Sequence, residues 1–268
     1  MFKVRLFDPD ESQSWLIRKF EEFRFEGEFL SEKFVPRPDI SLMFHFNDRP
    51  FISAETPVTL APFFASPILA KSLDLNFHGE MDSFVVVCRP TVLSKIFNLD
   101  LSSIKNSYIN LPEELFRPLW MELALLDNTP DRISLFSDFL NKIYPKTYER
   151  DSADILFDKI IEKGIGTLLK EIMSEFSECP RTLERTFIKR AGVSPKTLMR
   201  IVRLDYLWTR INDYNAVDYH GLVFDGHYFD QAHFINDFKS IIGEVPGFFF
   251  NRNLELVKMF SGRVQGEL

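Results

Sequence analysis

Two stretches of the sequence carry one pattern, displaced by 51 positions: Leu183-Glu-Arg-Thr-Phe187-Ile-Lys-Arg-Ala-Gly192-Val-Ser-Pro195 and Phe234-Ile-Asn-Asp-Phe238-Lys-Ser-Ile-Ile-Gly243-Glu-Val-Pro246. An apolar pair at i and i+4 predicts a helix with one face toward a core. The glycine fits a left-handed residue after the helix, and the proline fits the first turn of the next helix. The repeat therefore predicts two copies of one helical unit.

A second short apolar segment precedes each copy of the repeat. Its apolar residues are Leu168, Leu169, Ile172, Met173 and Phe176 in the first copy, and Tyr219, Leu222 and Phe224 in the second. A short helix, a tight turn and a second helix with an exposed face make a helix-turn-helix. A long amphipathic helix over residues 194–212, with Ile211 among its apolar positions, is expected to join the two units. The alternative is a helical bundle whose repeats only pack on one another.

Charge differs strongly between the two units. The chain as a whole has a net charge of −7 and a pI near 5.4, which argues against nonspecific nucleic-acid binding. Residues 179–210 nevertheless hold eight basic and two acidic residues, whereas residues 211–247 hold one basic and six acidic residues. Arg181, Arg185 and Lys189 recur at every fourth position and share one helix face. Such a face suits contacts with phosphates and base edges, whereas a merely solvated face usually mixes both signs of charge.

These features resemble a known family. Residues 153–252 resemble the double helix-turn-helix DNA-binding domain of AraC/XylS-type transcription regulators. The matching segments are Cys179-Pro-Arg-Thr-Leu-Glu-Arg-Thr-Phe187, Gly192-Val-Ser-Pro-Lys196 and Tyr228-Phe-Asp-Gln-Ala-His-Phe-Ile-Asn-Asp-Phe-Lys239, with Gly243 and Pro246. The resemblance implies an all-α domain whose two recognition helices enter successive major-groove faces of double-stranded DNA, about 34 Å apart.

The resemblance also assigns residues of the first unit to DNA. Arg181, Glu184 and Arg185 would face bases, since arginine can bind guanine through two hydrogen bonds and glutamate can accept one from cytosine. Thr182 and Lys189 would lie near phosphates.

In the second unit, the corresponding face holds Gln231, Ala232, Ile235 and Asn236. Amide side chains suit adenine, and the apolar ones suit a thymine methyl group. Further contacts with DNA, mostly with its backbone, are expected from His233, Lys239, Lys196 and Arg200.

The sequence departs from the family pattern at several positions. Ser177 and His227 stand where glycine is usual in the two turns, and Cys179 is a poor helix cap. Asn236 and Ser240 stand where basic residues are common. The first unit is therefore expected to supply most of the affinity, while the second unit makes a weak or shape-reading contact or has stopped binding DNA. A protein-interaction module with residual DNA binding is the alternative function, because the second unit is acidic.

The N-terminal half has a mixed pattern. Apolar, β-branched and aromatic runs at 41–47 and 83–89 predict strands. Helical spacing predicts helices over residues 115–126 and 133–143. The polar stretch 142–152, which contains Pro145, marks a boundary. We therefore expect an α+β domain over residues 1–145, the DNA-binding domain over 153–252 and a C-terminal tail over 253–268, without a strand after residue 153.

The N-terminal part has its own, looser resemblance. Residues 35–44 and the run Val87-Cys-Arg-Pro90, followed by a helix over residues 91–97, are similar to an N-terminal domain of unknown function found on a subset of AraC/XylS-type regulators. This resemblance implies sensing of a small-molecule effector or formation of a homodimer. Phe63 and Phe64 could line an effector pocket or pack in a core.

Enzyme and metal chemistry have no motif in this sequence. The patterns G-x-S-x-G, H-E-x-x-H and G-x-x-x-x-G-K are absent, so neither an enzyme nor a cofactor is expected. His227 and His233 lack a co-ligand at metal spacing. Cys88 is expected to be an inert core thiol, although redox sensing by Cys88 or Cys179 stays open. Two cysteines, no apolar run of about 18 residues and an early-charged N-terminus predict a cytoplasmic protein without a membrane span.

Overall fold

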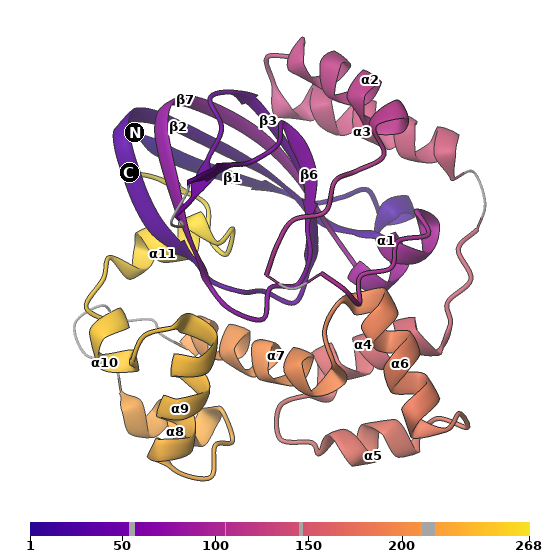
Figure 1. Cartoon of the computed structure of the whole chain (residues 1–268), viewed down its shortest axis with the longest axis vertical. Coiled ribbons are helices and arrows are strands. Elements are labelled where there is room, and N and C mark those ends of the chain that lie inside the picture. The colour runs from indigo at the N-terminus through magenta and orange to yellow at the C-terminus, as the bar shows by residue number, and fades with distance from the viewer. Residues whose placement is uncertain (54–56, 105, 145–146, 211–217) are drawn as a thin grey trace.

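A computed structural model describes residues 1–53, 57–104, 106–144, 147–210 and 218–268. A curved antiparallel sheet with a few helices forms the N-terminal part, and an assembly of helices lies beneath it in Figure 1. The predicted fold class, α+β followed by helices, is confirmed for these two parts. Within the described residues, no helix is long and apolar enough to cross a membrane.

The described residues include eight strands, all in one sheet. They are β1 (Phe2–Phe7), β2 (Ile17–Phe34), β3 (Ile40–Asn47), β4 (Phe51–Ile52), β5 (Val58–Thr59), β6 (Phe63–Ser66), β7 (Leu73–Cys88) and β8 (Gly266–Glu267). Their order is β5-β4-β7-β2-β1-β8, and β3 pairs with both β6 and β7. The long strands β2 and β7 are antiparallel from the Ile17–Cys88 pair to the Phe34–Leu73 pair, with two breaks in register. Such bulges bend the strands, so the sheet curves.

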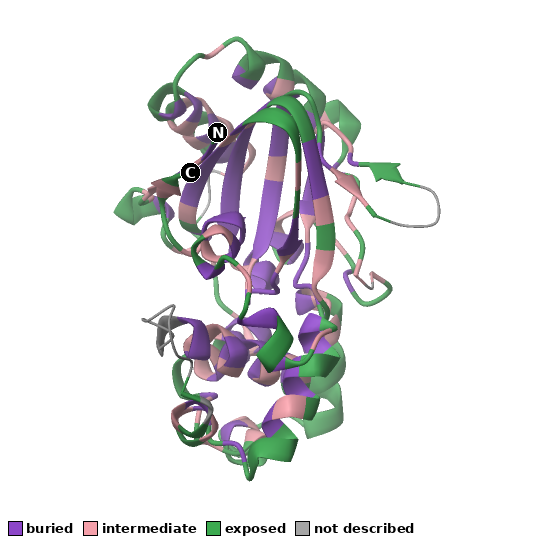
Figure 2. Cartoon of the chain, turned by 90° about the vertical axis from the view of Figure 1, so that its left-hand side faces the viewer, coloured by how far each residue is buried: buried purple, intermediate pink, exposed green. Residues whose placement is uncertain are grey.

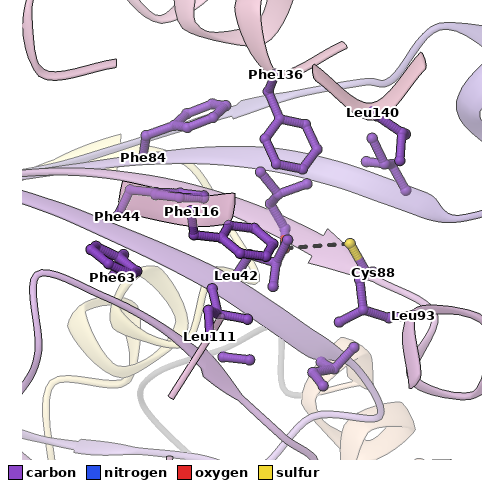
Figure 3. Close-up of a cluster of buried hydrophobic side chains, with 14 of the residues drawn as sticks. Leu42, Phe44, Phe63, Phe84, Cys88, Leu93, Leu111, Phe116, Phe136 and Leu140 are labelled. Atoms are coloured by element: carbon purple, nitrogen blue, oxygen red, sulfur yellow. Dashed lines mark hydrogen bonds between the residues drawn. The ribbon is translucent and has the colours of Figure 1, made fainter. Parts of the chain in front are cut away.

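One face of the sheet carries a phenylalanine-rich core (Figure 3). Phe20, Phe44 and Phe84 lie on the sheet, and Phe116 and Phe136 come from two helices, α2 (Glu113–Ala124) and α3 (Thr129–Ile143). These two helices match the helical spacing in the sequence. The sequence holds 29 phenylalanine residues. Because aromatic rings bury a large apolar area, those in this cluster make a large contribution to the core.

Cys88 lies in the same core. Its thiol is buried, and burial, with a smaller effect of Asp39, raises its pKa well above the usual value. A thiol that stays protonated is a poor nucleophile. This environment agrees with the prediction of an inert core thiol.

The opposite face of the sheet is covered by the C-terminal segment. Phe77 of β7 packs against Phe260 of α11 (Leu254–Phe260), with ring centroids 4.9 Å apart. Beyond α11, β8 pairs with β1, so residues 253–268 are an integral part of the N-terminal sheet. The expectation of no strand after residue 153 was therefore wrong. A strand of two residues carries no periodicity, and only its pairing with β1 defines it.

The remaining helices follow in chain order. They are α1 (Pro90–Ile96), α4 (Ser152–Lys163), α5 (Leu169–Ser174), α6 (Pro180–Ala191), α7 (Pro195–Arg210), α8 (Tyr219–Asp225), α9 (Gln231–Ile242) and α10 (Pro246–Phe249), with a short 3-10 helix at Glu11–Gln13. Asp151 and Asp154 form a capping box at the start of α4. Pro145, Ile211 and the predicted end of the linker helix at residue 212 lie outside the described residues.

Two cores hold the helical part together, and each includes a residue from the N-terminal part. Ile68 packs into the core of α4, α5 and α6, and Val35 packs into the core of α8, α9 and α10. In Figure 2 the buried residues of the sheet and of the helices meet between the two parts. The apolar stripe predicted for α8 is wrong at Phe224, which is 82% exposed.

Candidate nucleic-acid interface

The two repeated stretches fold as two copies of one unit, α5–α6 and α8–α9 (Figure 1). Gly192 after α6 and Gly243 after α9 have φ angles of 78° and 86°. These are left-handed conformations that favour glycine. Pro195 and Pro246 begin the next helices, as predicted. The apolar pairs of both repeats are buried: Leu183, Phe187, Phe234 and Phe238. The two stretches therefore fold as two similar helical pairs, which α7 separates along the chain.

Comparison with known proteins gives similar solved structures only. No family model matches the sequence, and no curated protein matches it. The chain is similar to unsaturated fatty acid-bound wild-type ToxT from Vibrio cholerae strain SCE256, at 14% identity over 99% of this chain and 98% of that chain, with a TM-score of 0.46. It is also similar to ToxT bound to (E)-4-(8-methylnaphthalen-1-yl)but-3-enoic acid, at 13% identity over 92% and 98% of the two chains, with a TM-score of 0.47.

The AraC-like transcriptional activator CuxR is similar at 15% identity, over 77% of this chain and 86% of that chain, with a TM-score of 0.29. At these identities and TM-scores the likeness carries no conclusion about function.

The outer face of α6 presents the polar side chains that the sequence assigned to DNA. Arg181, Thr182, Glu184, Arg185 and Lys189 are all exposed. None of them forms an ion pair with another residue that the structure describes. Arg181, Arg185 and Lys189 therefore make a continuous basic ridge along α6, on the side opposite the buried pair of the repeat.

The start of α6 is uncapped. Cys179 at the N-cap position makes no side-chain hydrogen bond to the helix, and Pro180 follows it. The first amide groups of a helix have no intrahelical partner. Together with the helix dipole, these amides make a favourable environment for an anion beside Arg181.

The outer face of α9 is polar with little charge. Gln231, Ala232, His233, Asn236 and Lys239 are exposed. Ile235 is half-buried and packs against the core of its own unit, so the structure separates it from the other five. The side chain of Asp230 accepts a hydrogen bond from the His233 amide and caps the helix.

The turn of the second unit contains the left-handed residue that the sequence indicated. His227 has a φ of 50°, a conformation that costs most side chains some strain. A methyl group placed on Gly166 would come within 3.2 Å of the His227 ring. Since Gly166 lies between α4 and α5, the turn of the second unit contacts the first unit.

Not every basic residue of the repeat region is free. Arg200 on α7 pairs with Asp237 on α9 and also donates to Ser240. The hydroxyl of Tyr228 donates to the other oxygen of Asp237 at 3.1 Å, and the Arg203 guanidinium lies 4.8 Å from the centre of the Tyr228 ring. This cluster ties the linker helix to the second unit. The predicted phosphate contact of Arg200 competes with its ion pair and stays a prediction, whereas Lys196 is exposed.

Sequence reasoning did not identify Asp237 as a structural residue. The position of Asp237 in the sequence could have indicated this role, because it lies one residue before Phe238 and three after Phe234, on the apolar face of α9. A buried carboxylate on such a face requires a partner.

The N-terminal part is hydrogen-bonded to the last turn of α6 and of α9, the second helix of each unit. The amide of Leu101 donates to the carbonyl oxygen of Lys189 on α6 at 2.9 Å, and the amide of Ser72 donates to the carbonyl oxygen of Ile241 on α9 at 2.8 Å. The last carbonyl groups of a helix have no intrahelical partner. The N-terminal part supplies these partners and leaves the first turns of both helices uncovered.

Arg190 strengthens the attachment of α6. Its guanidinium donates to the carbonyl oxygen of Thr91 on α1. It also pairs with Asp151, the N-cap residue of α4, and with Asp154 in the first turn of α4. Burial alone would raise the pKa of Asp151, but hydrogen bonds from Arg190 and Lys95 outweigh it and hold that pKa at about 2. Arg190 is therefore an interdomain residue and is not part of the basic ridge.

An apolar cavity lies within the N-terminal part, close to these attachments. It has about 760 Å³ of space, including the solvent at its mouth, and its wall includes Phe23, Phe34, Leu69, Leu73, Phe77 and Phe260. Leu69 and Leu73 lie on either side of a short segment that contains Ser72, whose amide donates to α9. Ile68, which packs in the core of the first unit, directly precedes Leu69. The sequence left two roles open for Phe63 and Phe64, pocket lining and core packing. Phe64 lines the cavity, whereas Phe63 packs in the phenylalanine-rich core. Among the described residues, no group of histidine, cysteine and acidic side chains could hold a metal ion.

Proposed function

We propose that this chain is a transcription regulator that binds double-stranded DNA sequence-specifically through α6 and α9, in successive major-groove faces. The basic ridge on α6 is the observation that carries the proposal. Its cations are exposed and form no ion pair with another described residue, and the last turn of the helix beneath it is hydrogen-bonded to the N-terminal part. Unpaired arginines at the open end of a recognition helix suit guanine edges and phosphates.

The two units make different contributions to DNA binding. The first unit supplies most of the affinity through the basic ridge, because phosphate contacts dominate the free energy of DNA binding. The second unit reads bases or DNA shape through Gln231, Asn236 and their neighbours, with Lys239 as the only cation among its predicted contacts. Its acidic residues add less repulsion than their number suggests, since Asp237 is neutralised by Arg200.

The N-terminal part controls the spacing of the two recognition helices. The segment of Ile68 and Ser72 contacts both units and also borders the apolar cavity. A ligand that changes the position of this segment changes the relative placement of α6 and α9, and hence the population that fits one DNA duplex. The cavity is accordingly the proposed effector site. Homodimer formation stays a prediction without an assigned surface.

Selection of bound DNA from a random library, with the full chain, tests the proposal. Two enriched half-sites about one helical turn apart are expected. The logarithm of the binding constant should fall linearly with the logarithm of the salt concentration, by about 0.9 for each neutralised phosphate. Failure to enrich any sequence, or an affinity that does not change with salt, would exclude the proposed function.

A further inference from the structure

The apolar cavity contains a polar atom without a partner. His45 on β3 lines the cavity and is 2% exposed. Its Nδ1 shares a hydrogen bond of 2.6 Å with the hydroxyl of Ser83, and its Nε2 has no partner among the described residues. A buried polar atom that lacks a hydrogen bond is costly. This nitrogen therefore marks the position where a ligand can gain a specific contact.

The charged groups of the cavity wall are already paired. Glu21 and Arg37 line the cavity and bind each other through two hydrogen bonds of 2.6 and 3.1 Å. Arg37 also donates to Ser41 and to the carbonyl oxygen of Ser261, so both of its terminal nitrogens are occupied. Lys19 adds a second cation to Glu21, at 3.1 Å. Among the described residues, the one cation in the wall, Arg37, is therefore already bonded to a carboxylate.

Other nearby cations lie outside the wall and have partners of their own. Lys33 does not line the cavity, and its ammonium group pairs with Asp74 and Glu244 at 2.8 and 3.3 Å. Burial, with repulsion from the Arg49 guanidinium, lowers the pKa of His45 to about 3, so the imidazole is neutral at physiological pH. Arg49 also lies outside the wall, and its guanidinium donates to the carbonyl oxygen of Leu60 at 3.1 Å. A carboxylate in this cavity would lose its hydration without gaining an unpaired cation of the wall as a partner.

We propose that the cavity binds an uncharged amphiphile of the alcohol class, whose apolar body packs on the aromatic and aliphatic wall and whose hydroxyl bonds to His45 Nε2. A hydroxyl can donate or accept, so it satisfies Nε2 in either tautomer of the imidazole. This inference rests on the proposed role of the cavity as effector site and specifies the chemistry of its ligand.

Three probes with one phenylpropyl body test the inference on the full chain: 3-phenyl-1-propanol, 3-phenylpropanoate and propylbenzene. The affinity of each is measured by the shift of the thermal midpoint with ligand concentration. The alcohol should bind at least about tenfold more tightly than the carboxylate, which lacks a counter-ion. In His45→Phe the alcohol should lose about fivefold in affinity, the effect of one neutral hydrogen bond, while propylbenzene keeps its affinity.

His78→Phe is the matched control, because His78 is exposed on β7, outside the cavity wall, and its replacement should change no affinity. Should His45→Phe fail to fold, the parent protein with ¹⁵N-labelled histidine gives the same answer. The Nε2 resonance of His45 should shift with the alcohol and stay in place with propylbenzene.

Equal binding of alcohol and carboxylate, or a His45→Phe variant with unchanged alcohol affinity, would overturn the inference. So would an unchanged Nε2 resonance on addition of the alcohol. DNA binding is measured separately. If the chain discriminates the probes through His45 but binds no DNA, this inference stands and the proposed function fails. If the chain binds DNA but does not discriminate the probes, the proposed DNA binding stands and this inference fails.

Discussion

The carbonyl oxygen of Lys189, in the last turn of α6, accepts a hydrogen bond of 2.9 Å from the amide of Leu101. Lys189 thus presents its ammonium group on the basic ridge while its backbone is held by the N-terminal part. The equivalent end of α9 is held in the same way through Ile241. Both second helices are therefore hydrogen-bonded to the N-terminal part at their last turns.

Replacement of Arg190 should weaken this attachment. Arg190→Ala leaves the buried Asp154 without its cation and Asp151 with Lys95 alone, and loss of one partner of a buried ion pair costs about 3 kcal/mol. The free energy of unfolding, measured with urea, should fall by about that amount. Arg185→Ala, on the exposed face of the same helix, should change it by less than about 0.5 kcal/mol. Equal effects of the two substitutions would contradict the role given to Arg190.

Arg185→Ala should act on DNA binding instead. Removal of an arginine that contacts a guanine should cost about 1–3 kcal/mol of binding free energy and relax specificity at one base position. Affinity for the selected operator and for operators changed at one base gives both quantities. Arg117→Ala is the matched control, because Arg117 is an exposed arginine on α2, paired with Glu113. An Arg185→Ala protein that binds as tightly as the parent refutes this assignment.

The two helix-ending glycines offer a test of backbone conformation. Gly243→Ala should lower the free energy of unfolding by about 1 kcal/mol through backbone strain alone, since no atom lies within 4 Å of the added methyl group. Gly243→Asn should cost less, because asparagine tolerates the left-handed conformation better. Chemical denaturation of the two variants compares them. The same loss from both would show that side-chain packing, not φ, sets the cost.

Stability should fall in mild acid because of His45. Its pKa is about 3 in the folded chain, against an ordinary value of 6.5. Between these values the unfolded chain binds one more proton, so the contribution is complete above about pH 6.5 and declines as the pH falls toward 3. The slope is about 1.4 kcal/mol per pH unit.

The unfolding free energy of His45→Phe, followed from pH 7 to pH 4, should lack this part of the slope. Other groups, such as Asp151 with its pKa of about 2, titrate lower and remain in both proteins. An unchanged slope would mean that His45 is protonated in the folded chain.

The helical repeat was predictable because its determinants are local. Pairs such as Leu183 and Phe187 lie one turn apart, and Gly192 and Pro195 end one helix and begin the next within four residues. The strands were less predictable. β2 and β7 are long, bulged and partly polar, so their sequences lack a clean alternation. β8 is too short to carry any pattern.

The candidate interface divides in the same way. The sequence alone determined two helix-turn-helix units, their left-handed glycine ends and a basic stripe on the first helix, because residues three or four apart on one helix must share a face. Only the tertiary structure decided which cations are free. Arg190 and Arg200 meet partners 36 or more residues away along the chain, and His45 meets Ser83 on the neighbouring strand. Pairings between distant segments follow from how those segments pack, which local sequence patterns do not encode.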